Sequence, residues 1–424
     1  MRRRFLFLQG PHGPFFGQLA HALETAGAET TRVLFNRGDA MFWPRELGSA
    51  RFTGKLDAWP NEIARRIDAF RASDLVLYGD TRPVHLEARK VAASSGVTVH
   101  VFEEGYLRPW WVTYERDGAN GGSKIASMSA DEIRQALEHP PADPVQAPEG
   151  WGALYRHMAY GAAYHAAILS GGPRLPSHRD TPVAREAWLH AVRLAGLPFH
   201  ALTRRVATRA LRRAGRPYHL VLLQLDHDEN FRRHGPFPGT EAFLDCVLHG
   251  FAAGAPSHHL LVLKAHPLED GRVPLSPLIR KLADRHGVRD RVRFLPGGKL
   301  GPLLNQSQSA VTVNSTAAQQ ALFRGLPVKA FGRAVYTRPE FVSPQPLPQF
   351  FASPHPPDRA AYADFRQFLL ETSQMPGSFY SGTGRLQLCR RLPDIMLSEQ
   401  DRYARAATVG AAARQHIRSG TTQI

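Results

Sequence analysis

Residues 97–105 read VTVHVFEEG, an apolar run rich in β-branched residues that is followed by two glutamates and a glycine. Such a run, bounded by the turn signals Gly96 and Gly105, predicts a buried β-strand over 97–102. A helix-compatible segment, 84–95, precedes it. The order helix, glycine, buried strand is typical of a parallel sheet, and open parallel sheets bind ligands at the carboxyl ends of their strands.

The same alternation extends back to the N-terminus. The predicted strands are 5–8, 31–35 and 74–78, and the predicted helices between them are 15–26 and 62–72. This rhythm indicates a parallel sheet covered by helices on both faces.

Residues 127–215 differ, because they are rich in Ala, His and Arg and contain few β-branched runs. Long helix-compatible stretches occur at 151–170 and 183–195. We predict a helical insert or bridge here.

The alternation returns in the second half of the chain. The predicted strands are 218–225, 259–264, 292–294, 310–313 and 328–331, with helices at 240–252, 275–286, 300–306 and 317–324. A Pro- and aromatic-rich tail follows from Pro344, and it becomes helical from about Ala360. We therefore predict an α/β, GT-B-like chain: two Rossmann-like parallel-sheet domains facing a central cleft, with a helical insert and a helical C-terminal tail. The predicted domains are 1–126 (acceptor side), 127–215 (insert), 216–343 (nucleotide-sugar side) and 344–424 (tail). This fold analogy gives no chemistry by itself.

Composition limits the class of protein. The chain is 43% hydrophobic and 21% charged, as globular proteins are, and its net charge of +16 favours an anionic partner such as nucleic acid, an acidic membrane or a sugar nucleotide. No apolar stretch approaches the ~18 residues that span a bilayer. The two cysteines, Cys246 and Cys389, suit free thiols in a reducing cytoplasm, so we expect a cytoplasmic or peripheral protein.

The acidic pair Glu103 and Glu104 leaves the strand 97–102 at its end. Neighbouring carboxylates can differ in pKa, so one of them can act as an acid or base near neutral pH. A solvated loop pair or a helix N-cap is the alternative. Arg108 is a phosphate- or carboxylate-binding residue type, and Trp110 with Trp111 offers either a sugar-stacking face or core.

Acids also leave the first strand of the second half, in the run Gln224-Leu225-Asp226-His227-Asp228-Glu229-Asn230. A carboxylate here can serve as a nucleophile toward an anomeric carbon, and Asp226 and Asp228 both remain candidates. A polar strand-exit loop is the alternative.

Two further strand ends carry anion-binding chemistry. His266, held extended by Pro267, follows Lys264, and together they can hold a phosphate. Asn314-Ser315-Thr316 precedes the helix 317–324, where hydroxyls and free backbone N–H groups form either an anion site or an ordinary N-cap. The loop of Gly10, Gly13 and Gly17 matches neither a P-loop nor a Rossmann fingerprint, although it can host an acceptor. The chain shows no zinc-type Cys/His spacing.

In this order the motifs resemble the capsule polysaccharide biosynthesis/export family of the KpsS/LipB type. The resemblance covers about residues 5–340. It is carried by FLFLQGPHGPFF (5–16), FNRGD (35–39), FEEGYLRP (102–109), Gln224, Asp228, His266-Pro267 and Asn314-Ser315-Thr316.

The resemblance implies a retaining glycosyltransferase, a β-Kdo transferase that moves Kdo from CMP-β-Kdo to a phosphatidylglycerol-type lipid and starts a poly-Kdo linker for capsule export. It implies no cofactor or metal beyond the donor CMP-Kdo. The implied partners are the anionic lipid acceptor at the inner face of the cytoplasmic membrane and a capsule assembly or export complex, with no nucleic acid.

The resemblance also implies roles for individual residues. Asp228 is the expected nucleophile, with Asp226 as the alternative. Glu104 or Glu103 is the acid/base or the acceptor-orienting group, and His266 binds and protonates the leaving phosphate. The expected substrate-binding residues are Lys264, Asn314, Ser315, Thr316, Arg108, Gln224 and Asn230.

Two other hypotheses about the function of the chain stay open. A non-catalytic glycolipid-binding export or assembly protein would also suit the basic surface. A nucleic-acid-binding protein is suggested by charge alone, and no RNA-binding signature or clustered basic helix supports it.

Overall fold

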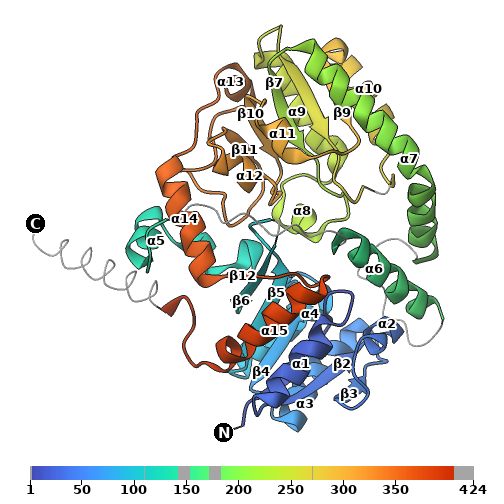
Figure 1. The fold of residues 1–424 in the computed structure, drawn as a ribbon, viewed down its shortest axis with the longest axis vertical. Helices are drawn as coiled ribbons and strands as arrows, with labels where there is room; N and C mark the ends of the chain where they lie inside the picture. Colours follow the sequence, from blue (N-terminus) through green and yellow to red (C-terminus); the bar gives the residue numbers. More distant parts are fainter. Residues whose placement is uncertain (1, 109, 142–152, 171–182, 270, 405–424) are drawn as a thin grey trace, which may run out of the picture. The chain divides into compact units, whose positions relative to one another are not determined.

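A computed structural model describes residues 2–108, 110–141, 153–170, 183–269 and 271–404. The chain divides into two compact units, Met1–Ala184 with Asp364–Ile424, and Arg185–Ala363. Figure 1 shows each unit as helices around a central sheet.

The first unit has a seven-stranded sheet in the order β12-β6-β5-β4-β1-β2-β3. Strands β1 to β5 are mutually parallel, whereas β6 is antiparallel to β5 and β12 is antiparallel to β6. The strands are β1 (Arg4–Phe7), β2 (Glu29–Leu34), β3 (Gly48–Arg51), β4 (Asp74–Tyr78), β5 (Thr98–Glu104), β6 (Trp111–Arg116) and β12 (Gln374–Pro376). The predicted parallel core is confirmed, and β3, β6 and β12 add strands that the periodicity did not predict.

Side-chain alternation in β1 explains how both faces of this sheet become buried. Phe5 and Phe7 pack with α1 and α15 on one face, while Leu6 and Leu8 pack with α3 and α4 on the other. The helices of this unit are α1 (Phe15–Thr25), α2 (Arg37–Met41), α3 (Trp59–Phe70), α4 (Pro83–Ser94), α5 (Ala130–Ala136), α6 (Ala153–Leu169) and α15 (Gly382–Leu397).

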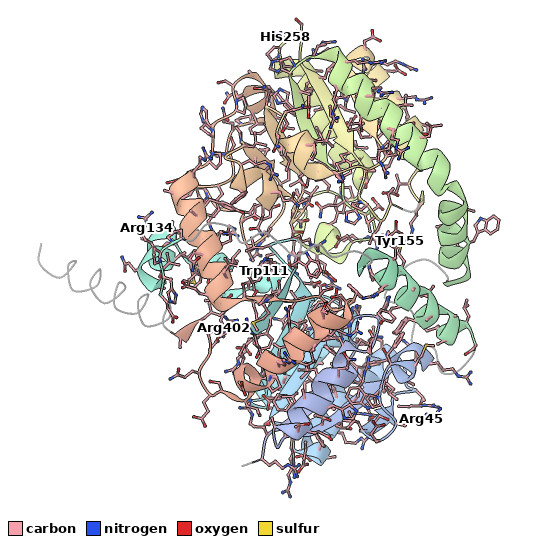
Figure 2. The ribbon with its side chains drawn as sticks, viewed as in Figure 1. Arg45, Trp111, Arg134, Tyr155, His258 and Arg402 are labelled. Atoms are coloured by element: carbon pink, nitrogen blue, oxygen red, sulfur yellow. The ribbon has the colours of Figure 1, made fainter. Side chains whose placement is uncertain are left out.

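The C-terminal tail contributes to the first unit. Strand β12 pairs with β6, and α15 packs on α1. Arg134 of α5, labelled in Figure 2, forms an ion pair with Asp364 at 2.9 Å. The predicted domain boundaries at 126, 215 and 343 remain predictions. The chain passes from one compact unit to the other after Ala184 and after Ala363.

The second unit has a five-stranded, fully parallel sheet in the order β11-β10-β7-β8-β9. Its strands are β7 (Tyr218–Leu222), β8 (Leu260–Lys264), β9 (Val292–Leu295), β10 (Ser309–Thr312) and β11 (Val328–Ala330). The remaining helices are α7 (Val183–Ala214), α8 (Glu229–His234), α9 (Thr240–Gly254), α10 (Leu275–Arg285), α11 (Leu300–Leu304), α12 (Ala318–Phe323), α13 (Leu347–Ala352) and α14 (Arg359–Thr372). Every strand predicted for this half is present.

The prediction of two Rossmann-like α/β units is therefore confirmed. The helical character expected of 127–215 is confirmed by α5, α6 and α7, although 142–152 and 171–182 lie outside the described residues. Within the described part of the chain, no helix is long and apolar enough to cross a membrane.

Candidate functional site

Glu103 and Glu104 are the last two residues of β5, and they extend past the end of its parallel partner β4, where Tyr78 pairs with Phe102. Instead they pair with Thr113 and Val112 of antiparallel β6. Between the strands, Gly105 makes the tight turn that the sequence predicts. A Cβ atom on Gly105 would lie 2.1 Å from the carbonyl oxygen of Trp111.

The environment of Glu103 favours its protonated form. Loss of solvent raises the pKa of Glu103 to about 7, and the nearby charges of Glu104 and Asp80 act in the same direction. The backbone N–H of Glu104, which donates to Oε1 of Glu103 at 3.1 Å, opposes this shift. A carboxyl group with a pKa near 7 suits acid–base chemistry at neutral pH.

Glu104 lies in a different environment, beside two tyrosines. The hydroxyl of Tyr78 donates to Oε1 of Glu104 at 3.1 Å. Burial raises the pKa of Tyr78 and of Tyr380, and the charge of Glu104 raises both further, so both phenols stay protonated. Glu104 is therefore oriented by a hydroxyl donor.

Asp80 and His85, which follow β4 in the chain, belong to the same polar region and were missed in the sequence. Oδ2 of Asp80 accepts from Arg89 and from the backbone N–H of Ala119, both at 3.1 Å. Its Oδ1 is buried without a hydrogen-bond partner among the described residues, as is Nε2 of His85. Burial lowers the pKa of His85 to about 3, so its ring is neutral. The strand-end reasoning that found Glu103 applies equally to the end of strand 74–78.

Helix α6 contacts the loops that follow β1 and β2. The ring of Tyr164 stacks on His12 with centroids 4.4 Å apart. The Tyr164 hydroxyl accepts from Asn36 at 2.9 Å and donates to Asp39 at 3.1 Å. His165 lies edge-on to His12. The loop proposed to host an acceptor is thus held by α6.

Arg108 and the tryptophans surround the Gly105 turn. Arg108 is exposed, and its Nε donates to the carbonyl of Gly105 at 3.2 Å. Trp111 opens β6, and Trp110 precedes it with a left-handed backbone (φ 76°). Both indoles are partly buried. They are therefore neither core residues nor a fully exposed stacking face.

In the second unit, Gln224 and Asn314 join the ends of β7 and β10. Nε2 of Gln224 donates to Oδ1 of Asn314 at 2.8 Å, and the backbone N–H of Asn314 donates to Oε1 of Gln224 at 3.0 Å. Both side chains are buried. Sequence reasoning correctly placed both residues at strand ends, and the structure shows them bonded to each other.

The two candidate nucleophiles differ in their contacts. Oδ1 of Asp226 accepts from the backbone N–H of Thr240, the first residue of α9, at 2.8 Å. Asp226 therefore caps a helix. Asp228 is partly exposed, and its backbone bonds to Leu225 and Arg232. The side chain of Asn230 lies outside the described residues.

Lys264 and His266 lie at the end of β8. Lys264 is only 6% exposed, and its Nζ donates to the carbonyl of Ala265 at 3.2 Å. Burial lowers the pKa of Lys264, and the charge of Arg204 on α7 lowers it further. Nδ1 of partly exposed His266 accepts from the backbone N–H of Leu268 at 3.1 Å. In the neutral ring the proton therefore lies on Nε2, which acts as a donor. Arg204 was not identified from the sequence, because its helix is remote in the chain.

Ser315 and Thr316 precede α12, which begins at Ala318, one residue later than predicted. The Ser315 hydroxyl accepts from the backbone N–H of Ala317 at 3.2 Å, and the Thr316 carbonyl accepts from Gln319. The residue at the N-cap is Ala317, which provides no side-chain cap. The alternative of an ordinary N-cap formed by a hydroxyl side chain is therefore wrong.

The predicted residues gather in two sets, one in each unit. Glu103, Glu104 and Arg108 lie around the end of β5. The second set follows the adjacent strands β10, β7 and β8. Among the described residues, no group of three or more His, Cys, Asp or Glu side chains is arranged to hold a metal ion. The shared crevice expected for the two sets stays a prediction.

Fold and site together define a class: an α/β protein of two Rossmann-like units with polar side chains at the carboxyl ends of parallel strands, the position at which such sheets bind ligands. Residues 73–380 match the family of capsule polysaccharide biosynthesis proteins, and the chain belongs to that family.

Two curated relatives are similar over most of their length. The capsule polysaccharide export protein KpsS of Escherichia coli is 29% identical over 386 residues, 89% of this chain and 97% of the relative. The capsule polysaccharide modification protein LipB of Neisseria meningitidis serogroup B is 30% identical over 384 residues, 89% of this chain and 91% of the relative.

Solved structures also resemble the chain. The β-Kdo 2,7 transferase KpsC of Thermosulfurimonas dismutans has a TM-score of 0.45 at 13% identity, over 92% of this chain and 99% of the other. A glycosyltransferase of Rickettsia africae has a TM-score of 0.36 at 9% identity, over 94% and 100%.

Proposed function

We propose that this capsule biosynthesis protein is a retaining glycosyltransferase that moves Kdo from CMP-β-Kdo to a phosphatidylglycerol-type lipid. The observation that carries the proposal is Glu103, a strand-end carboxyl with a pKa of about 7, beside Glu104. Family membership supplies the capsule context, and the ordered motifs supply the donor and acceptor.

Retention is consistent with two displacements. In the first, the Asp228 carboxylate attacks the anomeric carbon of Kdo, and the bond to the CMP phosphate breaks with its electron pair on CMP. In the second, an acceptor hydroxyl attacks that carbon and the Asp228 carboxylate leaves. The hydroxyl proton passes to Glu103, which acts as the base.

The other residues bind and orient the substrates. Because Nδ1 of His266 accepts from Leu268, its Nε2–H is the proposed group that binds and protonates the leaving phosphate. Ser315, Thr316, Lys264 and Asn230 are proposed to contact the same nucleotide. Glu104, held by Tyr78, orients the acceptor, and Arg108 meets an anionic group. Gln224 and Asn314 hold the ends of β7 and β10 in register.

Asp228 is the proposed nucleophile because it belongs to the motifs that carry the family resemblance, and Asp226 remains the alternative. Oδ1 of Asp226 accepts from the Thr240 backbone N–H.

We further propose that the protein acts without a cofactor, at the inner face of the cytoplasmic membrane and in contact with a capsule assembly or export complex. The regions assigned to the acceptor and the nucleotide sugar are 1–126 and 216–343. Nucleic acid is not a proposed partner.

Transfer is tested by incubating the purified protein with CMP-Kdo and a short-chain phosphatidylglycerol, and detecting the Kdo-lipid by mass spectrometry. CMP-N-acetylneuraminate serves as the donor control. Product with CMP-Kdo alone, lost in Asp228→Asn, supports the proposal. Absence of product with every CMP-sugar overturns it. Capsule output retained by Asp228→Ala cells would favour the non-catalytic glycolipid-binding alternative.

A further inference from the structure

The expectation that the chain has no clustered basic helix is wrong, because the part of α7 from Leu202 to Ala214 is one. It contains five arginines and no acid: Arg204, Arg205, Arg209, Arg212 and Arg213. Among the described residues, none of these guanidinium groups forms an ion pair with a carboxylate, although surface arginines elsewhere in the chain do so, as Arg65 does with Glu62. A dense group of cations on one helix favours an anionic partner.

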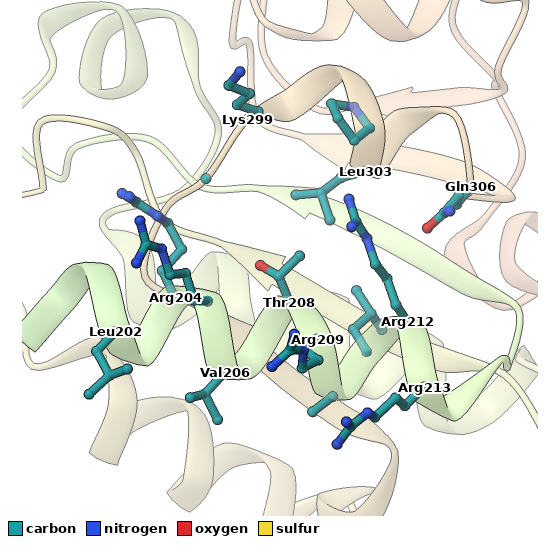
Figure 3. A pocket seen from close by; sticks show the side chains of 15 residues that line it. Leu202, Arg204, Val206, Thr208, Arg209, Arg212, Arg213, Lys299, Leu303 and Gln306 are labelled. Atoms are coloured by element: carbon teal, nitrogen blue, oxygen red, sulfur yellow. The ribbon is translucent and has the colours of Figure 1, made fainter.

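These arginines line a cavity of about 1090 Å³ beside α11, shown in Figure 3. Lys299 adds a sixth cation from the opposite wall, and Thr208 and Gln306 add hydrogen-bonding groups. None of the described residues that line the cavity is acidic. The stem of Arg204 lies against Gly298, where a Cβ would be 3.5 Å from Cδ of the arginine. The cavity thus suits anionic groups such as phosphates.

The same helix exposes a row of large apolar side chains. Leu202 is 60% exposed and Val206 is 61% exposed, one helical turn apart, and Figure 3 shows both pointing to the same side. At 100° per residue, both fall on one side of the helix together with Arg209 and Arg213. Trp188 and Val192 are also exposed, but Pro198 separates them from this segment of α7.

One partner satisfies both features. A free nucleotide or an RNA would neutralise the arginines but would leave Leu202 and Val206 in water. A lipid bilayer accepts apolar side chains at the level of its acyl boundary, while anionic headgroups pair with cations around them.

We propose that the face of α7 formed by Leu202, Val206, Arg209 and Arg213 (the α7 face) docks on an anionic phospholipid bilayer. The arginine cavity, which these residues also line, receives lipid headgroup phosphates. This inference deepens the proposed function, because it names the surface that meets the membrane holding the acceptor. The docking itself depends on neither the donor nor the chemistry.

Flotation of the full-length protein with vesicles tests the proposal. Vesicles of phosphatidylcholine with phosphatidylglycerol should bind the protein, vesicles of phosphatidylcholine alone should bind it far less, and salt should weaken binding. Arg209→Glu with Arg213→Glu should weaken binding by at least about tenfold, since each cation near an anionic surface contributes about fivefold. Leu202→Ser with Val206→Ser should also weaken it several-fold, because less apolar surface is transferred from water.

Leu386→Ser is the matched control, because Leu386 of α15 is 53% exposed and lies outside the α7 face. It should bind vesicles as the native protein does, and circular dichroism should show that every variant is folded. Unchanged vesicle binding in both α7 variants would overturn the proposal. Equal binding to neutral and anionic vesicles would also overturn it. So would a native protein that binds RNA but does not bind phosphatidylglycerol vesicles.

A transfer assay separates this inference from the proposed function. Both α7 variants should retain turnover with a short-chain, water-soluble acceptor and lose it with vesicle-borne acceptor. Vesicle docking without any transfer would leave the α7 inference standing and reject the transferase. If both α7 variants transfer Kdo to a vesicle-borne acceptor as well as the native protein does, the transferase stands and the α7 inference is rejected.

Discussion

The hydroxyl of Tyr78, the last residue of β4, donates a hydrogen bond of 3.1 Å to the carboxylate of Glu104, the last residue of β5. This bond between neighbouring strand ends distinguishes two glutamates that look equivalent in the sequence. Glu104 is held by a hydroxyl donor, whereas loss of solvent raises the pKa of Glu103 to about 7. The two carboxyl groups are therefore suited to different tasks.

Replacing Glu103 and removing the hydroxyl that orients Glu104 should lower turnover to different extents. Glu103→Gln should reduce kcat by about 10²- to 10⁴-fold, because it removes the base. Tyr78→Phe should cost only about tenfold or less, since it loosens Glu104 without removing a charge. Steady-state kinetics with CMP-Kdo would measure both effects. Equal losses in Glu103→Gln and Tyr78→Phe would contradict the assigned roles.

The pH profile of turnover should respond to Asp80. A base must be ionised, so activity should rise with pH through about 7. The charge of Asp80 raises the pKa of Glu103, so Asp80→Asn should move this rise to lower pH by up to about one unit. Asp117→Asn is the control and should leave the profile unchanged. The side chain of Asp117 is 57% exposed, and its carboxylate pairs with Lys124. A shift to higher pH in Asp80→Asn would rule out this electrostatic coupling.

Glu103 should also make stability depend on pH. Its pKa is raised from 4.5 to about 7 in the folded protein, so the folded state binds the proton more tightly than the unfolded state. Stability should therefore fall as pH rises from about 4.5 to about 7. Glu103→Gln removes this term and should gain about 2 kcal/mol relative to the native protein between those limits.

Urea unfolding of the native protein and Glu103→Gln at pH 5 and pH 8 would measure the difference. The native protein keeps a second such group, because burial also raises the pKa of Glu115 to about 7. Only the difference between the two proteins isolates Glu103. An identical difference at both pH values would show that Glu103 titrates normally.

Asp226 and Asp228 should separate into structural and chemical roles. Asp226→Ala should lower stability by about 1 kcal/mol, because the N–H of Thr240 loses its acceptor. Asp228→Asn should leave stability and CMP-Kdo affinity nearly unchanged while reducing turnover by orders of magnitude. Calorimetry and donor titration would decide. If turnover is lost in Asp226→Asn and preserved in Asp228→Asn, Asp226 is the nucleophile and the assignment to Asp228 is wrong.

Gly105 should tolerate no side chain. Gly105→Ala would place Cβ 2.1 Å from a backbone oxygen of Trp111, so the hairpin that holds Glu103 and Glu104 must shift. We expect a loss of several kcal/mol, or failure to fold. Gly382→Ala is the control, because no atom lies within 4 Å of its added Cβ. Similar melting temperatures for the two variants would refute this account.

The local patterns determined much of the fold. Period-2 alternation in 5–8 and buried runs such as 260–264 specify strands whatever surrounds them, because an apolar run must be covered. They also placed Glu103, Gln224 and His266 at strand ends. The antiparallel strand Trp111–Arg116 escaped prediction because the turn at Gly105 and the partner Gln374–Pro376 are set by contacts remote in sequence.

By itself, the sequence determined two α/β units, the positions of their strand-end polar residues and the family of the chain. Only the tertiary structure decided that the tail completes the first sheet, that Asp226 caps α9 while Glu104 binds Tyr78, and that the arginines of α7 line a cavity without an acid. The physical reason is that periodicity reports which residues must leave water, whereas pKa values, hydrogen-bond partners and exposed faces depend on which distant segments cover them.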